Sequence, residues 1–240
     1  MSKNFKIFFG FIYLLILTAF LYFIFSKIEI NRLNDFSYYK EMQLGLNSFI
    51  SSNLIINIFY FFMFSIIWVA LMGFGSPILI ISGILFGKWT GTIISLISVS
   101  IGALILYSIA NFFFRDLVKK ILEKKFKKYI QLFQKNEFYY FFIYRFVGGL
   151  GVPFFLQNVL PVLFNMKKSN YFFSSLFGFV PGIFVFNTIG AGLNTYVMQS
   201  SNFSLLELLL TPEIYFPILM FFILMILSLI IKKRFFDNVN

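Results

Sequence analysis

The stretch Gly73-Phe74-Gly75-Ser76-Pro77, followed by the apolar run 78–86 and by Gly87-Lys88, decides the fold of this chain. Glycine and proline interrupt helices. The nine residues of the apolar run are too few to cross a bilayer, which takes about 20 residues in a helix. An apolar segment of this length between helix breakers is typical of a re-entrant hairpin, which enters a membrane and returns to the same side.

The composition indicates that the surroundings are a bilayer. Of the 240 residues 60% are hydrophobic and 12% are charged, whereas soluble domains have about 45–50% and about 25%. The chain has no His and no Cys, and so lacks the commonest metal ligand, the commonest general base and any thiolate nucleophile. We therefore expect an all-α integral membrane protein that is not an enzyme and has no metal or cofactor.

Other apolar runs predict about five spanning helices, over residues 7–26, 54–72, 89–114, 169–194 and 214–231. The first follows two lysines as a signal sequence does, but it is too long and has no small-residue cleavage site, so it is expected to stay uncleaved. Residues 42–53 contain several Asn and Ser and are predicted to be interfacial.

A second hairpin is predicted between Phe138 and Met166. This segment is apolar except for Arg145. It contains two prolines and three glycines, which one straight helix does not accommodate. These are Gly148, Gly149, Gly151, Pro153 and Pro161.

The two hairpins belong to a weak internal repeat of 76 residues. The shift superimposes Gly75 on Gly151, Pro77 on Pro153 and Gly102 on Gly178. Two halves that each contain a broken element are how transporters build a site between inverted repeats. We expect an N-terminal region over 1–53, a core over 54–195 and a C-terminal region over 196–240.

The linker between the hairpins, residues 115–135, is strongly basic. It has eight basic residues, and its apolar residues recur at helical spacing, which predicts an amphipathic helix at the membrane interface. The positive-inside rule places this linker and the C-terminal Lys232-Lys233-Arg234 in the cytoplasm, and five spans would put the N-terminus outside. The net charge of +11 is therefore assigned to loops and lipid headgroups rather than to nucleic acid, because no nucleic-acid module is recognisable.

Arg145 is the most informative single residue, because an arginine at bilayer depth costs about 2.5–3.5 kcal/mol on insertion scales. Two interpretations stay open: it faces a polar cavity and binds a phosphate, or it snorkels to the interface or bonds carbonyls freed by the hairpin. Other polar residues in these segments more often hold helices together than bind substrate; they are Asn111, Ser82, Gln157, Asn158, Asn187 and Thr188. No acidic residue lies within 42–87 or 138–206, which argues against strong ion coupling and aspartyl proteolysis.

The segment 77–87, PILIISGILFG, resembles the first hairpin of DedA-like membrane proteins, whose shared region is called the VTT or SNARE-associated Golgi protein domain. The resemblance covers roughly 70–195 and continues with Arg145, Pro153-Phe154, Asn158, Gly178, Pro181-Gly182 and Gly190. The acidic residue that precedes this hairpin in DedA proper is missing, so the chain looks more like the Tvp/Tmem branch. Asn111 stands where many relatives have a basic residue, with Arg115 four positions on.

The resemblance implies a bacterial inner-membrane protein, or one of the Golgi or endoplasmic reticulum, that moves phospholipids or polyprenyl phosphates between leaflets. Arg145, Asn158, Asn111 and Arg115 would then bind substrate, and anionic lipids would be the partners. Structural roles fall to Pro77 and Pro153 as breakers, to Gly83, Gly87 and Gly151 at close approaches, and to Pro181, Gly182 and Gly190. A transporter of small solutes or oxyanions and a structural or assembly protein are the alternatives, and a homo-oligomer is left open.

Overall fold

The computed structural model describes residues 35–71, 73–200 and 202–231, with isolated positions nearer the two ends. All regular structure in these ranges is helical, as the sequence predicts. The predicted helix over 7–26 lies mostly outside the described residues, as does most of the terminal basic triplet.

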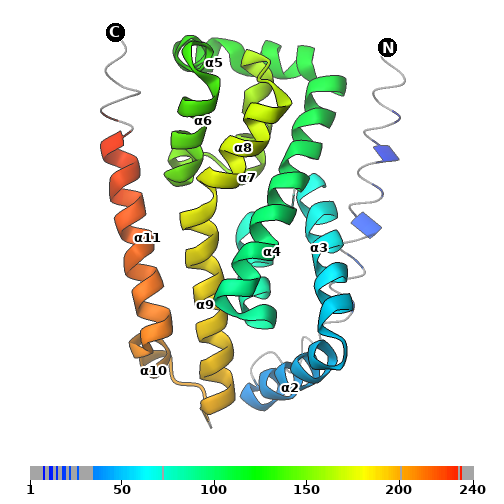
Figure 1. Ribbon diagram of the computed structural model, residues 1–240, viewed down its shortest axis with the longest axis vertical. Helices are drawn as coiled ribbons and strands as arrows, with labels where there is room; N and C mark the ends of the chain where they lie inside the picture. The colour runs from blue at the N-terminus through cyan, green and yellow to red at the C-terminus, as the bar shows by residue number, and fades with distance from the viewer. Residues whose placement is uncertain are drawn as a thin grey trace.

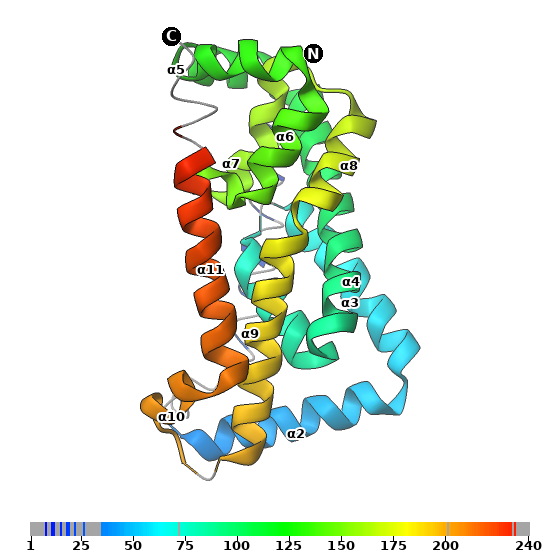
Figure 2. The same ribbon diagram turned by 60° about the vertical axis from the view of Figure 1, so that its left-hand side comes forward.

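Two helices lie across opposite ends of the molecule and the others run between them (Figures 1 and 2). The end helices are α2 (Phe36–Ser52) and α5 (Arg115–Lys135). The others are α3 (Leu54–Ala70), α4 (Gly75–Phe113), α6 (Glu137–Phe146), α7 (Phe154–Val159), α8 (Lys168–Gly178), α9 (Val180–Gln199), α10 (Leu205–Leu210) and α11 (Pro212–Ile231), with 3-10 turns η2 (Gly148–Gly151) and η3 (Leu160–Phe164). The predicted boundaries at Leu54 and over 115–135 are confirmed.

The first hairpin consists of α3 and the beginning of α4. Gly87 has φ 73° and ψ 175°, so α4 reverses there, and we call residues 75–86 α4a and 88–113 α4b. The reversal brings the hydroxyl of Ser82 within 3.1 Å of the Gly91 carbonyl, to which it donates. The left-handed φ at Gly87 is readily available only to glycine.

Helix α3 and α4a run antiparallel around the predicted break. At one end Trp68 Nε1 donates to the Phe74 carbonyl over 2.8 Å, and at the other the rings of Phe61 and Phe86 lie 5.3 Å apart. Helix α3 has 17 residues and makes up the first leg of this hairpin and most of the segment predicted to be the second spanning helix. It counts as a candidate span only together with α2.

The second hairpin consists of α6, a glycine-rich turn, and α7 with η3. Gly148, Gly149 and Gly151 have φ of 74°, 75° and 78°, which glycine adopts without a steric penalty. A Cβ at Gly87 or at Gly151 would meet nothing within 4 Å. The expectation of close approach at these two positions is therefore wrong, because what they supply is the left-handed backbone of a turn.

Equivalent contacts occur in the two halves of the predicted repeat. A Cβ on Gly102 would lie 2.8 Å from the carbonyl oxygen of Ile66 and 2.8 Å from Cβ of Val69. A Cβ on Gly178 would collide with Cβ of Arg145 and lie 3.0 Å from the carbonyl oxygen of Phe142. Phe142 and Arg145 are Ile66 and Val69 shifted by the same 76 residues, so each half packs a glycine against the first leg of its own hairpin.

The two hairpin turns meet inside the molecule. The ring of Phe154, directly after Pro153, lies 3.4 Å from the position of a Cβ on Gly75. Pro77 is in the first turn of α4a and Pro153 directly precedes α7, positions where a missing N–H breaks no helical hydrogen bond. Both prolines therefore mark the turns, as predicted.

Two described helices, α4 and α11, are long and apolar enough to cross a bilayer, and up to four spans result if two bent helix pairs each count as one. The pairs are α2 with α3, bent by 111°, and α8 with α9, bent by 45°. The second bend precedes Pro181, in the first turn of α9, where proline cannot continue the helical hydrogen bonds of α8. Four of the five predicted spans fall within the described residues, where two to four candidate spans are found.

Helix α9 crosses the first hairpin at two glycines. A Cβ on Gly83 would collide with the Asn187 carbonyl, and one on Gly190 with the Ile80 carbonyl. The predicted close approach at Gly83 is confirmed, and Gly190 acts in the same way from the other helix. Gly182, in contrast, faces open space.

We predict that Gly190→Val lowers the melting temperature of the detergent-solubilised protein, because the added carbons meet a backbone carbonyl that cannot rotate away. Overpacking costs about 1–3 kcal/mol, which corresponds to a fall of about 5 °C in a chain of this size. Gly182→Val on the same helix is the matched control. Equal melting temperatures for the two variants would contradict the crossing.

Candidate functional site

Arg145 lies in the last turn of α6 and its side chain is turned into the protein. It is 2% exposed. Its Nη1 donates to Gln157 Oε1 over 3.2 Å, and its Nη2 donates to Asn158 Oδ1 over 2.6 Å and to the Tyr171 hydroxyl over 2.9 Å. The guanidinium therefore joins both legs of the second hairpin to α8, and the snorkelling interpretation is wrong.

Aromatic rings surround the same charge. The guanidinium carbon lies 4.7 Å from the ring centroid of Phe141, 4.6 Å from that of Phe179 and 5.6 Å from that of Tyr171. Ring faces attract a cation at such distances. Among the described residues, its hydrogen bonds and ring contacts include no carboxylate. Dipoles and rings, rather than an opposite charge, therefore surround the cation.

Two donors of this cluster have no hydrogen-bond partner. They are Nε of Arg145 and Nδ2 of Asn158, and both residues are buried. A buried donor without a partner costs about 1–3 kcal/mol. An oxyanion has the acceptors that would satisfy both donors, and guanidinium groups bind such anions with strong, directional hydrogen bonds.

Gln157 connects the arginine to the turn of the hairpin. While its Oε1 accepts from Arg145, its Nε2 donates to the Val152 carbonyl over 2.6 Å and to the Gly148 carbonyl over 3.3 Å. One interpretation of the sequence is that Arg145 bonds the carbonyls freed by the turn. In the structure Gln157 makes those hydrogen bonds, and Arg145 in turn bonds Gln157. The glutamine holds the glycine-rich turn and the guanidinium in one network.

A stack of two tyrosines links this network to α4b. The rings of Tyr107 and Tyr171 are 4.6 Å apart and 10° from parallel. The Tyr107 hydroxyl donates to the Met166 carbonyl over 2.6 Å, and the Tyr171 hydroxyl also donates to Asn158 Oδ1 over 3.2 Å. Sequence reasoning missed both residues, because nothing in their local sequence separates them from the other Tyr among 13.

Of the four predicted substrate residues, the structure joins two. Arg145 and Asn158 are hydrogen-bonded, whereas no described hydrogen bond connects Asn111 or Arg115 to them. Asn111 lies near the end of α4b with its Oδ1 buried and without a partner. Arg115 begins α5 and is half-buried.

Helix α5 covers the second hairpin with part of its apolar stripe. Phe126, Ile130 and Phe133 pack against the core, and the ring of Phe133 stacks on Phe164 at 4.7 Å and 8°. Leu117 and Ile121 are 52% and 62% exposed. One part of the predicted interfacial face therefore packs on the apolar surface of the hairpin beneath it, and the other part is exposed on the outside of the protein.

The polar cluster is confined to one half of the repeat. A shift of 76 residues replaces Arg145, Asn158 and Tyr171 by Val69, Ser82 and Ser95, and these three are also buried. The described residues contain no group of three or more His, Cys, Asp or Glu that could hold a metal ion. The arrangement offers hydrogen-bond donors and a positive charge, which is the chemistry that an anion would require.

Repeated helical hairpins, packed with apolar helices that can cross a bilayer, define a polytopic membrane protein. Residues 74–192 match the model of the VTT domain family, and this segment belongs to that family, which confirms the resemblance expected from the sequence. Over 122 residues the chain is 28% identical to the uncharacterized protein YqeD of Bacillus subtilis (strain 168). That match covers 50% of this chain and 58% of YqeD, so the chain spans little more than half of that relative. No solved structure matches.

We predict that Tyr171→Phe destabilises the protein, because it removes the hydroxyl bonded to Arg145 and Asn158 and keeps the ring stacked on Tyr107. The free energy of unfolding should fall by about 1–3 kcal/mol, the usual cost of leaving a buried polar partner unsatisfied. Tyr139→Phe, which removes a hydroxyl from an exposed residue of the same hairpin, should change little. The test is thermal unfolding in detergent, and equal losses in the two variants would contradict the proposed network.

Proposed function

We propose that the protein moves phosphate-bearing lipids between the two leaflets without a chemical reaction, and that Arg145 contacts the headgroup phosphate. The observation that carries this proposal is a buried guanidinium that contacts no carboxylate among the described residues. Its own Nε and the adjacent Asn158 Nδ2 are donors without partners, and it lies in the hairpin whose turn meets that of the other repeat. Uncompensated charges in membrane segments are costly, and where they occur they usually mark a substrate pathway.

The short legs of the second hairpin support a site at the depth that such movement needs. Helix α6 has 10 residues, about 15 Å, or half of a hydrocarbon core of about 30 Å. A hairpin that enters from one face would then hold Arg145, in its last turn, near the midplane. In this proposal Asn158 orients the guanidinium, and Arg115 and Asn111 meet the headgroup nearer the α5 end.

The distribution of charge supports an orientation. We place α5 and the C-terminus on the cytoplasmic face of a bacterial inner membrane, because basic residues are retained on that side. Six basic side chains on the first four turns of α5 are exposed or half-exposed: Arg115, Lys119, Lys120, Lys124, Lys125 and Lys127. Such a helix attracts anionic lipids by about 1 kcal/mol per basic residue.

A soluble oxyanion is the second candidate substrate, because the same two N–H groups could donate hydrogen bonds to it. Transport of such an anion would saturate with its concentration and would not depend on lipid headgroups. A structural or assembly role would produce no flux of either kind. Lipid and anion flux are therefore measured on the same preparation.

We predict that Arg145→Gln and Asn158→Asp each slow lipid movement by about tenfold or more, since hydrogen bonds to charged groups contribute about 1.5–3 kcal/mol and each 1.4 kcal/mol is tenfold. Asn158→Asp is the sharper variant. It keeps the acceptor for Arg145 and replaces the free amide nitrogen by a carboxylate oxygen, so it neutralises the site without removing a hydrogen bond.

The measurement is dithionite quenching of fluorescent phospholipids in proteoliposomes, beside empty vesicles and Lys127→Gln, which also removes one positive charge. Quenching well beyond half of the label in the wild type and in Lys127→Gln, with a slow second phase in the two site variants, is the expected result. A plateau at half in the wild type, or fast quenching in a folded Asn158→Asp, refutes the proposal. Saturable uptake of phosphate with a plateau at half would identify the anion carrier.

A further inference from the structure

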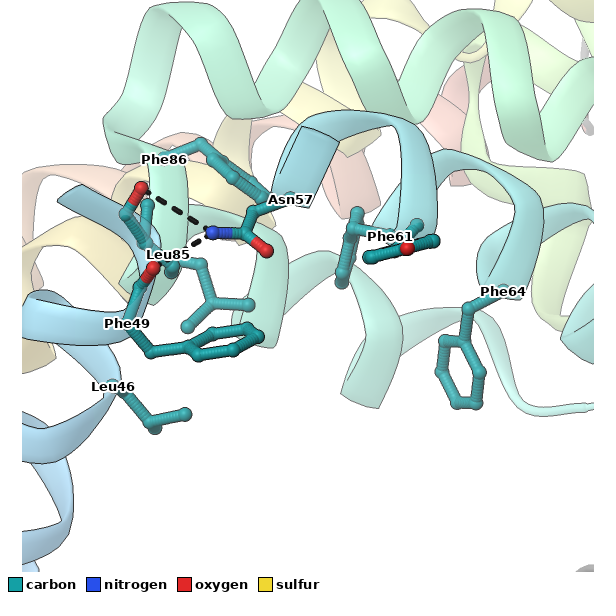
Figure 3. Close-up of a pocket in the computed structure, with 9 residues that line it drawn as sticks. Leu46, Phe49, Asn57, Phe61, Phe64, Leu85 and Phe86 are labelled. Carbon is teal, nitrogen blue, oxygen red and sulfur yellow. Dashed lines mark hydrogen bonds between the residues drawn. The ribbon is translucent and has the colours of Figure 1, made fainter. Parts of the chain in front are cut away.

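An apolar groove of about 230 Å³ lies in the angle between α2 and α3, beside the end of α4a (Figure 3). Its walls include Leu46 and Phe49 from α2, Phe61 and Phe64 from α3, and Leu85 and Phe86 from α4a. The amide nitrogen of the Asn57 side chain, also in the wall, donates to the carbonyls of Phe49 and Ile50 at 2.7 and 3.4 Å. That donor is thereby engaged with the end of α2, and the groove offers mainly hydrocarbon and ring surface.

The other half of the repeat has the same arrangement, and there protein fills the corresponding angle. Helix α5 precedes the second hairpin as α2 precedes the first, at the opposite end of the molecule (Figure 2). Phe133 is buried between α5 and the hairpin and stacks on Phe164, and Phe126 packs beside it. Apolar side chains close this angle in the second half, whereas among the described residues the equivalent angle in the first half is not filled.

Size and charge identify what completes the open groove. A helix with its side chains is about 10 Å or more in diameter, so a groove of this volume is too small to hold one. A flexible hydrocarbon chain is thinner and fits the groove. Two residues beyond Phe86, at the reversal of α4, Lys88 is exposed and Trp89 is 67% exposed. An exposed cation beside an exposed indole suits the level of lipid phosphates, where tryptophan is enriched.

We propose that this groove binds one acyl chain of an anionic phospholipid, with its headgroup phosphate beside Lys88. The site deepens the proposed function, on which it rests, because it names the lipid class and gives the chain a place on the first hairpin. The headgroup contact at Arg145 and the chain contact at Leu85 and Phe86 then belong to different halves of the repeat. The groove is occupied whether or not the lipid subsequently crosses.

Photo-crosslinking tests the groove directly. The purified protein is placed in phosphatidylcholine nanodiscs with a trace of phosphatidylglycerol that carries a diazirine in the middle of one acyl chain, and the labelled peptides are mapped by mass spectrometry. We expect labelling of the groove residues several-fold above that of the exposed apolar face of α11. Leu46→Trp, which fills the groove, should remove most of this excess, and Leu44→Trp, an exposed position on the same helix outside the wall, should retain it.

Lys88→Gln tests the headgroup. It should reduce labelling by the phosphatidylglycerol probe to the level of a phosphatidylcholine probe with the same diazirine chain, and leave the latter unchanged. Even labelling of α11 and the groove, or an unchanged pattern in Leu46→Trp, would overturn the site. Crosslinks through the groove between two copies of the chain would overturn it in favour of a dimer contact.

The crosslinking result is independent of flux. Groove labelling without lipid movement would retain the site and reject the proposed function. Lipid movement together with a groove that is labelled no more than α11 would retain the proposed function and reject the groove site.

Discussion

The hydrogen bonds of the Arg145 guanidinium are the contacts on which the second half of the molecule depends. They tie α6 to α7 through Asn158, to the turn through Gln157 and to α8 through Tyr171. In hydrocarbon, an irregular turn is tolerated only where protein or a cavity satisfies its backbone groups. Gln157, which is itself held by Arg145, donates to the carbonyls of Gly148 and Val152. These hydrogen bonds satisfy the backbone of the turn and allow the chain to reverse there.

The sequence predicts those parts of the fold that depend on local chemistry. The start of α3, the two ends of α5, both glycine-rich turns and the 76-residue spacing of glycine and proline follow from the apolar runs and from the positions of glycine and proline. The sequence does not show which glycine allows a close helix contact and which supplies a left-handed turn. Gly83 allows a helix crossing and Gly87 supplies a positive φ, yet four residues apart in one apolar run they look the same.

The candidate site could be predicted only as far as its polar residues in apolar segments. Arg145 and Asn158 are polar residues in apolar segments and are evident for that reason. Their partners Tyr171 and Phe179 come from 26 and 34 residues further along the chain. The chain has 13 Tyr and 39 Phe, so the selection of these two is made by the packing of α6 against α8 and α9, which no local pattern encodes.

The replacement of Arg145, Asn158 and Tyr171 by Val69, Ser82 and Ser95 gives the two halves of the repeat different interiors. If a substrate follows the proposed route, its free energy is lower beside the charged cluster of the second half than at the equivalent position of the first. The difference would determine where that substrate dwells and which step is slow. By microscopic reversibility it cannot produce net movement in one direction, so accumulation on one side would require a gradient or another source of work outside these helices.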